Sequence, residues 1–180
     1  TNKGTKVKSS IIAIAGGLGC FEPRKPLIDN IGNYEGKGID YIIKDPEKYN
    51  GKKVVIGGGG DSALDWTIFL SDKVKSLTLV HRRNEFRGAF DSVEKVQTLK
   101  NKGVIDVITP AEINSIKGDD KLKEVSIQKE GVIKNVETDY FIPLFGLTPK
   151  LGPLSDWGLE IENNSIKVNN SLDYQTNIPG

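Results

Sequence analysis

The sequence predicts an α/β fold in which a central parallel sheet carries helices on one face and an antiparallel three-stranded meander on the other. The first observation is a β-branched run at 52–56 that leads through four successive glycines into a helical pattern at 61–70. The second is a strand pattern at 76–81, which completes a βαβ unit and therefore a parallel strand pair. The third is the alternation of apolar and polar residues over 112–138, which is typical of antiparallel strands with one packed face.

The N-terminal part predicts one strand and a long connector. A short apolar run at 10–15, closed by Gly16 and Gly17, is typical of a buried strand that ends in a tight turn. Residues 21–50 are rich in Pro and Gly, which favours turns and at most short secondary structure. This connector is long for one compact domain, so we interpret it as a passage between two domains.

The middle of the chain predicts two helices and the strands that alternate with them. Residues 61–70 place apolar side chains at spacings that suit a helix buried over much of its surface. Apolar residues recur at three-residue intervals over 89–101, which predicts a second helix that stops before Gly103. A third parallel strand is expected at 104–108, and the apolar segment 139–146 is expected to return into the main sheet.

The meander is expected to contain strands at 112–116, 122–128 and 132–138, joined by turns at 117–120 and 130–131. Apolar and polar residues alternate along each strand, so one face should be packed and the other should face water. The tail of the chain then predicts two short strand-like pieces.

The composition indicates a soluble globular chain. Of 180 residues, 37% are hydrophobic and 27% are charged, which excludes a disordered polypeptide. The formal net charge of +1 argues against nucleic acid as a partner, and no apolar run approaches the roughly 20 residues of a membrane span. Cys20 is the only cysteine, which excludes an internal disulfide and a cysteine-based zinc site and favours a reducing, cytoplasmic location. The absence of Met and the abrupt end suggest a piece of a longer protein.

The glycine-rich turn carries the clearest functional signal. It matches the G-x-G-x-x-A fingerprint of dinucleotide-binding folds, directly after a strand and at the start of a helix, where free amides and the positive dipole end face phosphate groups. Gly58 permits the tight turn, Gly60 leaves room for a pyrophosphate, and Ala63 allows close helix–strand packing. Asp61 or Ser62 is expected to cap the helix. The predicted cofactor-binding residues of this turn are Gly58, Gly59, Gly60, Asp61, Ser62 and Ala63; the alternative is a plain glycine turn without a ligand.

The tip of the next strand indicates which dinucleotide is expected. NAD-binding units usually place a carboxylate there to bind the ribose 2′-hydroxyl. Here the strand ends in His81, Arg82 and Arg83, and Arg87 follows. Guanidinium groups suit bidentate binding of a 2′-phosphate, so NADP is predicted over NAD, with a solvated basic turn as the alternative. His81, the only histidine, is interpreted as a neighbour that packs beside the adenine ribose and not as a catalytic acid.

These motifs, together with Phe-Gly-Leu-Thr-Pro at 145–149, resemble the NADPH-binding domain of the thioredoxin-reductase superfamily. Within it, the chain is most similar to the thioredoxin-reductase-like ferredoxin–NADP reductases, over nearly its whole length. The resemblance implies a Rossmann-like NADP-binding domain at 31–155. It also implies a remnant or linker of a flavin domain at 1–30 and the start of a return segment toward that domain at 156–180.

The resemblance further implies the cofactors and partners. NADPH and FAD would exchange a hydride, and the flavin would exchange single electrons with ferredoxin or flavodoxin. Gly146 would contact the nucleotide, Phe21 would lie against the flavin, and the full-length protein would be a homodimer. No catalytic side chain and no metal are expected, because the cofactors carry the chemistry. The chain alone is expected to be inactive, since most of the flavin site is not in it.

Three alternatives stay open at this point. Thioredoxin reductases carry a Cys-x-x-Cys shortly before the fingerprint strand, but residues 38–46 contain no cysteine, so a dithiol relay is excluded. A thioredoxin-reductase homologue with another acceptor is the first alternative, and a non-catalytic NADP sensor is the second. A stand-alone oxidoreductase is the third; it would need an acid such as a Tyr–Lys pair, for which Tyr41 and Lys44 lie in a turn-rich segment. Asp65 is interpreted as structural.

Overall fold

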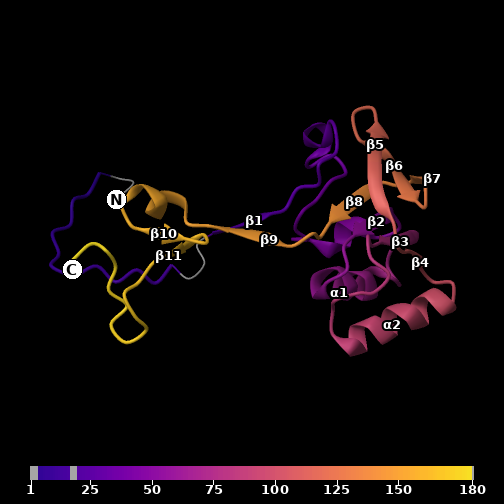
Figure 1. Ribbon diagram of the computed structural model, residues 1–180. Coiled ribbons are helices and arrows are strands. Elements are labelled where there is room, and N and C mark those ends of the chain that lie inside the picture. Colours follow the sequence, from indigo (N-terminus) through magenta and orange to yellow (C-terminus); the bar gives the residue numbers. More distant parts are fainter. Residues whose placement is uncertain (1–3, 17–19, 180) are drawn as a thin grey trace. The chain divides into compact units, whose positions relative to one another are not determined.

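The computed structural model describes residues 4–16 and 20–179, which form two compact units (Figure 1). The larger unit is Pro23–Gly146, and the smaller unit joins the described parts of Thr1–Glu22 and Leu147–Gly180. The assignment of the outer segments to a flavin domain stays a prediction.

A four-stranded parallel sheet forms the centre of the larger unit, as predicted. Its order is β4-β3-β2-β8, and its strands are β2 (Lys53–Gly57), β3 (Ser76–Val80), β4 (Asp106–Ile108) and β8 (Tyr140–Pro143). Val55 of β2 pairs with Thr78 on one side and with Phe141 on the other. The strand predicted at 139–146 therefore does return into the main sheet, directly beside the glycine-bearing strand.

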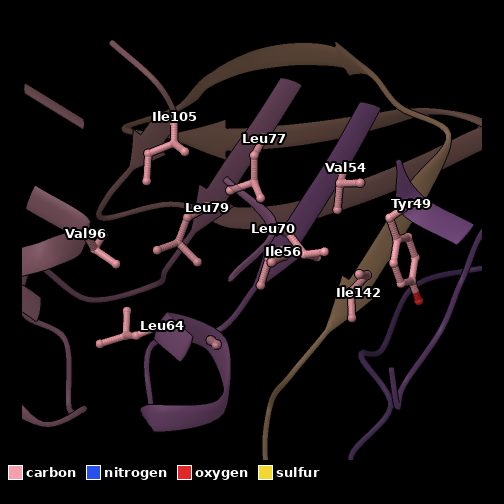
Figure 2. Packing of buried hydrophobic residues seen from close by; sticks show 11 residues of the cluster. Tyr49, Val54, Ile56, Leu64, Leu70, Leu77, Leu79, Val96, Ile105 and Ile142 are labelled. Carbon is pink, nitrogen blue, oxygen red and sulfur yellow. The ribbon is translucent and has the colours of Figure 1, made fainter. Parts of the chain in front are cut away.

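Both helices cover one face of this sheet (Figure 1). They are α1 (Asp61–Leu70) and α2 (Phe90–Asn101), and Gly103 follows α2 with φ +69°. Val54 and Ile56 point toward the helices and pack with Leu64, Leu70 and other apolar side chains in one buried cluster (Figure 2). Among the described helices, none is long and apolar enough to cross a membrane.

The meander covers the opposite face. Its antiparallel strands are β5 (Glu112–Gly118), β6 (Leu122–Lys129) and β7 (Val132–Glu137). Val55 and Phe141, whose neighbours in the strands face the helices, pack here against Val125 and Ile127. Each central strand is thus buried on both faces, which explains why these strands are continuous apolar runs.

The connector predicted at 21–50 has only short structure, but part of it belongs to the core. It contains the 3₁₀ turns η1 (Ile31–Tyr34) and η2 (Pro46–Tyr49). Tyr49 is fully buried, and its hydroxyl donates to Asp40 at 2.9 Å.

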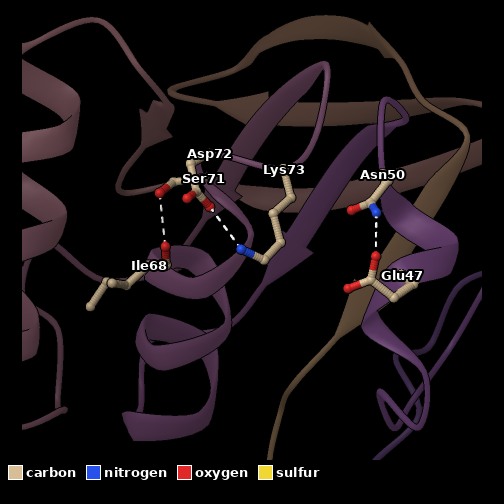
Figure 3. Close-up of polar contacts among 6 residues, drawn as sticks. All are labelled: Glu47, Asn50, Ile68, Ser71, Asp72 and Lys73. Atoms are coloured by element: carbon tan, nitrogen blue, oxygen red, sulfur yellow. Dashed lines mark hydrogen bonds and ion pairs between the residues drawn. The ribbon is translucent and has the colours of Figure 1, made fainter.

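Side-chain hydrogen bonds lie at the carboxyl ends of η2 and α1 (Figure 3). The Asn50 side-chain amide donates to the Glu47 carboxylate at 2.5 Å, and the Ser71 hydroxyl donates to the Ile68 carbonyl at 2.8 Å. Because Tyr49 packs in the buried cluster with Val54 and Ile56, the connector is not a simple passage between domains; its second half packs on the sheet that carries the glycine-rich turn.

The smaller unit contains two short two-stranded sheets. β1 (Cys20–Pro23) pairs with β9 (Leu147–Lys150), and β10 (Ile161–Glu162) pairs with β11 (Ser165–Ile166), with η3 (Gly152–Asp156) between them in sequence. The pair β10 and β11 corresponds to the two strand-like pieces expected in the tail.

The strand predicted at 10–15 is wrong. This segment has no regular secondary structure, and Ile11 and Ile12 are 72% and 61% exposed. An apolar run forms a strand only where a neighbouring strand satisfies its backbone groups, and the sequence pattern does not contain that information. Gly17, expected in the turn after it, lies outside the described residues.

Candidate functional site

The candidate site lies at the carboxyl ends of the parallel strands. β3 lies on one side of β2 and β8 on the other, so the direction of the strand order changes at β2. In open α/β sheets, ligands bind outside the carboxyl ends of the strands at such a switch point. The segments after β2, β3 and β8 are linked there by backbone hydrogen bonds: Gly58 donates to Val80 at 3.0 Å, and Leu144 donates to Gly57 at 2.7 Å.

Gly58 is required by the backbone of the turn. It has φ +151°, where residues with a side chain are strained. A Cβ at this position would lie 2.6 Å from the Leu144 carbonyl oxygen and 2.8 Å from the Ala63 Cβ. Gly58 and Ala63 therefore allow the turn, β8 and α1 to approach one another closely.

Gly59 is required because the His81 ring lies directly beside it. A Cβ here would lie 2.3 Å from Nδ1 of His81, so the imidazole ring fills the space beside the turn. His81 is buried, its Nε2 lies 3.1 Å from the Glu85 carbonyl oxygen, and its ring stacks on Phe86 with centroids 5.4 Å apart. His81 thus packs the glycine-rich turn against the segment that follows β3.

Gly60 faces open space. An added Cβ would meet no heavy atom within 4 Å, and φ is −99°, which any residue can adopt. Gly60 is the N-cap of α1, and among the described residues no side chain caps the helix, so the expectation that Asp61 or Ser62 does so is wrong. The first amides of a helix have no intrahelical acceptor, so this open side can receive an anionic group.

The Asp61 carboxylate instead accepts a hydrogen bond from a residue that is distant in the sequence. Its Oδ1 accepts the backbone N–H of Ala89 at 2.7 Å, and Ala89 is the N-cap residue of α2. Ser62 is exposed in the first turn of α1. Asp65, one turn further on, accepts the Ser92 hydroxyl at 3.0 Å and so joins the two helices, which agrees with its structural interpretation.

The three arginines of the predicted site lie in one exposed loop. Arg82, Arg83 and Arg87 are all exposed in the loop between β3 and α2. In the part of the chain that the structure describes, none of them forms an ion pair with a carboxylate. The backbone N–H of Arg87 donates to the Gly59 carbonyl at 2.6 Å, so this loop lies directly against the glycine-rich turn.

The environment of His81 disfavours its charged form. Burial lowers the pKa of the ring below 6.5, and the positive charges of Arg82 and Arg87 lower it further, although the Glu85 carbonyl acts in the opposite direction. The ring is therefore held neutral, and with Nε2 donating to the Glu85 carbonyl, the unprotonated Nδ1 faces Gly59.

We expect the pKa of His81 to be measurable directly, because it is the only histidine. Its Cε1 proton should titrate below pH 6.5 in NMR spectra of the folded chain. The unfolded chain takes up this proton at higher pH than the folded chain, so the free energy of unfolding should fall as pH drops below 6.5. The limiting slope for one proton is about 1.4 kcal/mol per pH unit.

In the variant His81→Gln, the free energy of unfolding should lack this part of the pH dependence. Urea unfolding, at pH values between the pKa of His81 in the unfolded chain and that in the folded chain, measures the difference. A histidine pKa at or above 6.5 would contradict the assigned packing.

Phe145 lies at the same edge of the sheet, although the sequence analysis named it only as part of the 145–149 motif and not as a candidate site residue. It follows β8, is 38% exposed, and its ring lies 3.0 Å from the position that a Cβ of Gly57 would take. Gly146 follows with φ +93°, and its carbonyl accepts the Arg24 N–H at 3.0 Å. An aromatic residue directly after a strand beside the fingerprint strand is the signal that could have identified Phe145.

Two other sequence candidates are Phe21 and Tyr41. Phe21 belongs to β1 in the smaller unit and is half-exposed. The Tyr41 hydroxyl donates to Glu35 at 3.0 Å; burial and then this hydrogen bond raise its pKa far above the usual range, which makes it a poor general acid.

Comparison with known proteins identifies relatives of the whole chain. A family model described as pyridine nucleotide-disulphide oxidoreductase matches residues 1–180. The chain is 65% identical over 180 residues to a ferredoxin–NADP reductase of Flavobacterium johnsoniae, covering 100% of this chain and 51% of that protein. It is 64% identical over 181 residues to the corresponding protein of Flavobacterium psychrophilum, covering 100% of this chain and 52% of that protein.

Among solved structures, the chain resembles T. acidophilum thioredoxin reductase with a TM-score of 0.75 and 27% identity. The match covers 90% of this chain and 53% of that one. The chain therefore spans about half the length of the curated relatives it matches.

Proposed function

Because the chain belongs to the pyridine nucleotide-disulphide oxidoreductase family, we propose that its larger unit binds NADP(H) in a ferredoxin–NADP reductase. The observation that carries the proposal is the pairing of an open, uncapped helix N-terminus at Gly60 with three exposed arginines that form no ion pair among the described residues. The helix N-terminus suits a pyrophosphate, and the arginines suit a ribose 2′-phosphate.

The residues of the larger unit divide between the two halves of the nucleotide. The loop after β3 supplies Arg82, Arg83 and Arg87 to the adenosine half. The segment after β8 supplies Phe145 and Gly146 on the opposite side of β2, where we assign the nicotinamide half. When bound, NADPH and FAD would supply the hydride chemistry, while these residues would bind and orient the nucleotide.

The finer parts of the proposal concern the full-length protein and its partners. The ferredoxin–NADP reductases that match the chain are named for ferredoxin, and we propose ferredoxin or flavodoxin as the electron partner. FAD in the full-length protein, its contact with Phe21, a homodimer and a cytoplasmic location belong to the same proposal.

The nucleotide part can be tested on the chain itself. Isothermal titration with NADP⁺ and NAD⁺ should give at least about tenfold tighter binding of NADP⁺, because each charge-assisted phosphate contact contributes on the order of 1.5–3 kcal/mol. Equal affinities would overturn the assignment of the arginines.

The enzymatic part can be tested with a chimaera. Placing this chain in the Flavobacterium johnsoniae protein, in exchange for the 180-residue segment that it matches, should give a flavoprotein that oxidises NADPH and reduces ferredoxin. A chimaera that binds FAD but does not oxidise NADPH would contradict the proposal and favour a sensor role. Reduction of another acceptor in place of ferredoxin would favour the thioredoxin-reductase-like alternative.

A further inference from the structure

We propose that Asp61 is a positioning residue for NADP preference: its carboxylate holds the arginine loop, residues 82–89, against the glycine-rich turn before a nucleotide binds. This inference rests on the proposed function. It assigns part of the discrimination between NADP and NAD to a side chain outside the arginine loop, which acts by positioning the arginines.

The first step is the contact between α1 and the end of the loop. Asp61 Oδ1 accepts the Ala89 N–H at 2.7 Å, although 28 residues separate them in the sequence. The preceding residue, Gly88, packs so closely on α1 that a Cβ would lie 2.5 Å from Leu64 Cδ1 and 3.2 Å from Asp61 Oδ1. The end of the loop is thus seated on the first turn of α1, with the carboxylate as its hydrogen-bond acceptor.

The second step is that the remainder of the loop is also tied to its surroundings. Arg87 donates its N–H to the Gly59 carbonyl at 2.6 Å, and the His81 ring contacts both the Glu85 carbonyl and the Phe86 ring. The backbone is held at these points while the arginine side chains stay exposed. A loop ordered in advance lowers the entropic cost of binding, so holding its backbone raises affinity for the group that the arginines recognise.

The third step concerns charge. A carboxylate in the first turn of α1 is stabilised by the helix dipole, but it repels an incoming pyrophosphate. That repulsion acts on NADP and NAD alike, because both carry the pyrophosphate. The ratio of the two affinities therefore isolates the effect of Asp61 on the arginine loop.

Two substitutions separate the hydrogen bond from the charge. Asp61→Asn removes the charge but keeps a side-chain oxygen that can accept from Ala89, whereas Asp61→Ala removes both. By titration calorimetry, Asp61→Ala should reduce the NADP-to-NAD affinity ratio about tenfold, the expected effect of losing one hydrogen bond to a charged group. Asp61→Asn should keep the ratio within about threefold of the wild-type value, since the acceptor remains.

A second readout follows the loop without any nucleotide. Trypsin cleaves after arginine, so cleavage at Arg82, Arg83 and Arg87 reports how often the loop opens. Asp61→Ala should accelerate these cleavages about tenfold, in proportion to the lost stabilisation of the closed loop, and Asp61→Asn should not. Cleavage at Lys121, in the exposed turn between β5 and β6, is the internal control for general unfolding and should not change.

A further variant tests the same loop with Asp61 intact. Gly88→Ala places a methyl group 2.5 Å from Leu64 Cδ1, and because Leu64 is fully buried in the core, the loop should shift and the NADP preference should fall in the same way.

An unchanged affinity ratio or an unchanged cleavage rate in Asp61→Ala would overturn the inference. Equal binding of both nucleotides by the wild-type chain would instead overturn the proposed function, and the cleavage experiment would still report on the loop.

Discussion

Replacing Arg82 and Arg83 together with Ala is expected to weaken NADP(H) binding by about two to four orders of magnitude, because two charge-assisted contacts of about 1.5–3 kcal/mol each are lost. NAD(H) binding should weaken by less than about tenfold, because NAD lacks the 2′-phosphate and loses only long-range attraction. Both arginines are exposed, so the substitution removes no buried packing. Titration calorimetry with each nucleotide measures the two changes.

A matched control removes the same charge elsewhere. Lys52 and Lys75 are exposed cations that precede β2 and β3, at the amino ends of the parallel strands and so opposite the carboxyl ends. Their replacement with Ala should leave both affinities within about twofold, since exposed charges beyond a Debye length are screened. An equal loss of NADP and NAD affinity in the arginine variant would show that these side chains do not recognise the 2′-phosphate.

The elements that the sequence predicted correctly are those whose signal is local. The βαβ unit around Gly58 combines a β-branched strand, a glycine turn and a helical repeat in adjacent segments, and each reports on its own conformation. The meander was predictable for the same reason, since alternation along 112–138 reveals one packed face. The apolar segment 10–15 has the same local pattern but no regular structure, because a strand also depends on a partner elsewhere in the chain.

The candidate site was predictable in its residue types but not in its contacts. The fingerprint and the arginines are short motifs, whereas the acceptor role of Asp61 depends on Ala89, which the fold brings to it from 28 residues away. The packing of His81 on Gly59 likewise arises only when β2 and β3 lie side by side. Asp61 was predicted to cap α1 because Asp is common near the start of helices. In the structure its carboxylate accepts from the Ala89 N–H and not from an amide of α1.

The last expected result separates ligand binding from folding at two neighbouring glycines. Gly60→Val should abolish detectable binding of NADP(H) and NAD(H), because its side chain would enter the open space assigned to the pyrophosphate. The free energy of unfolding should fall by no more than about 1 kcal/mol, the usual cost of a poor N-cap residue, since the added atoms meet no neighbour.

Gly58→Ala should instead destabilise the folded chain. Its methyl group would meet the Leu144 carbonyl and Ala63, and φ +151° is strained for alanine, so the chain should lose about 2 kcal/mol or more of stability. Urea unfolding and titration calorimetry on both variants measure the two effects independently. Normal nucleotide binding by a folded Gly60→Val chain would show that the phosphate lies elsewhere, because a valine side chain and a pyrophosphate cannot occupy the same space above the first turn of α1.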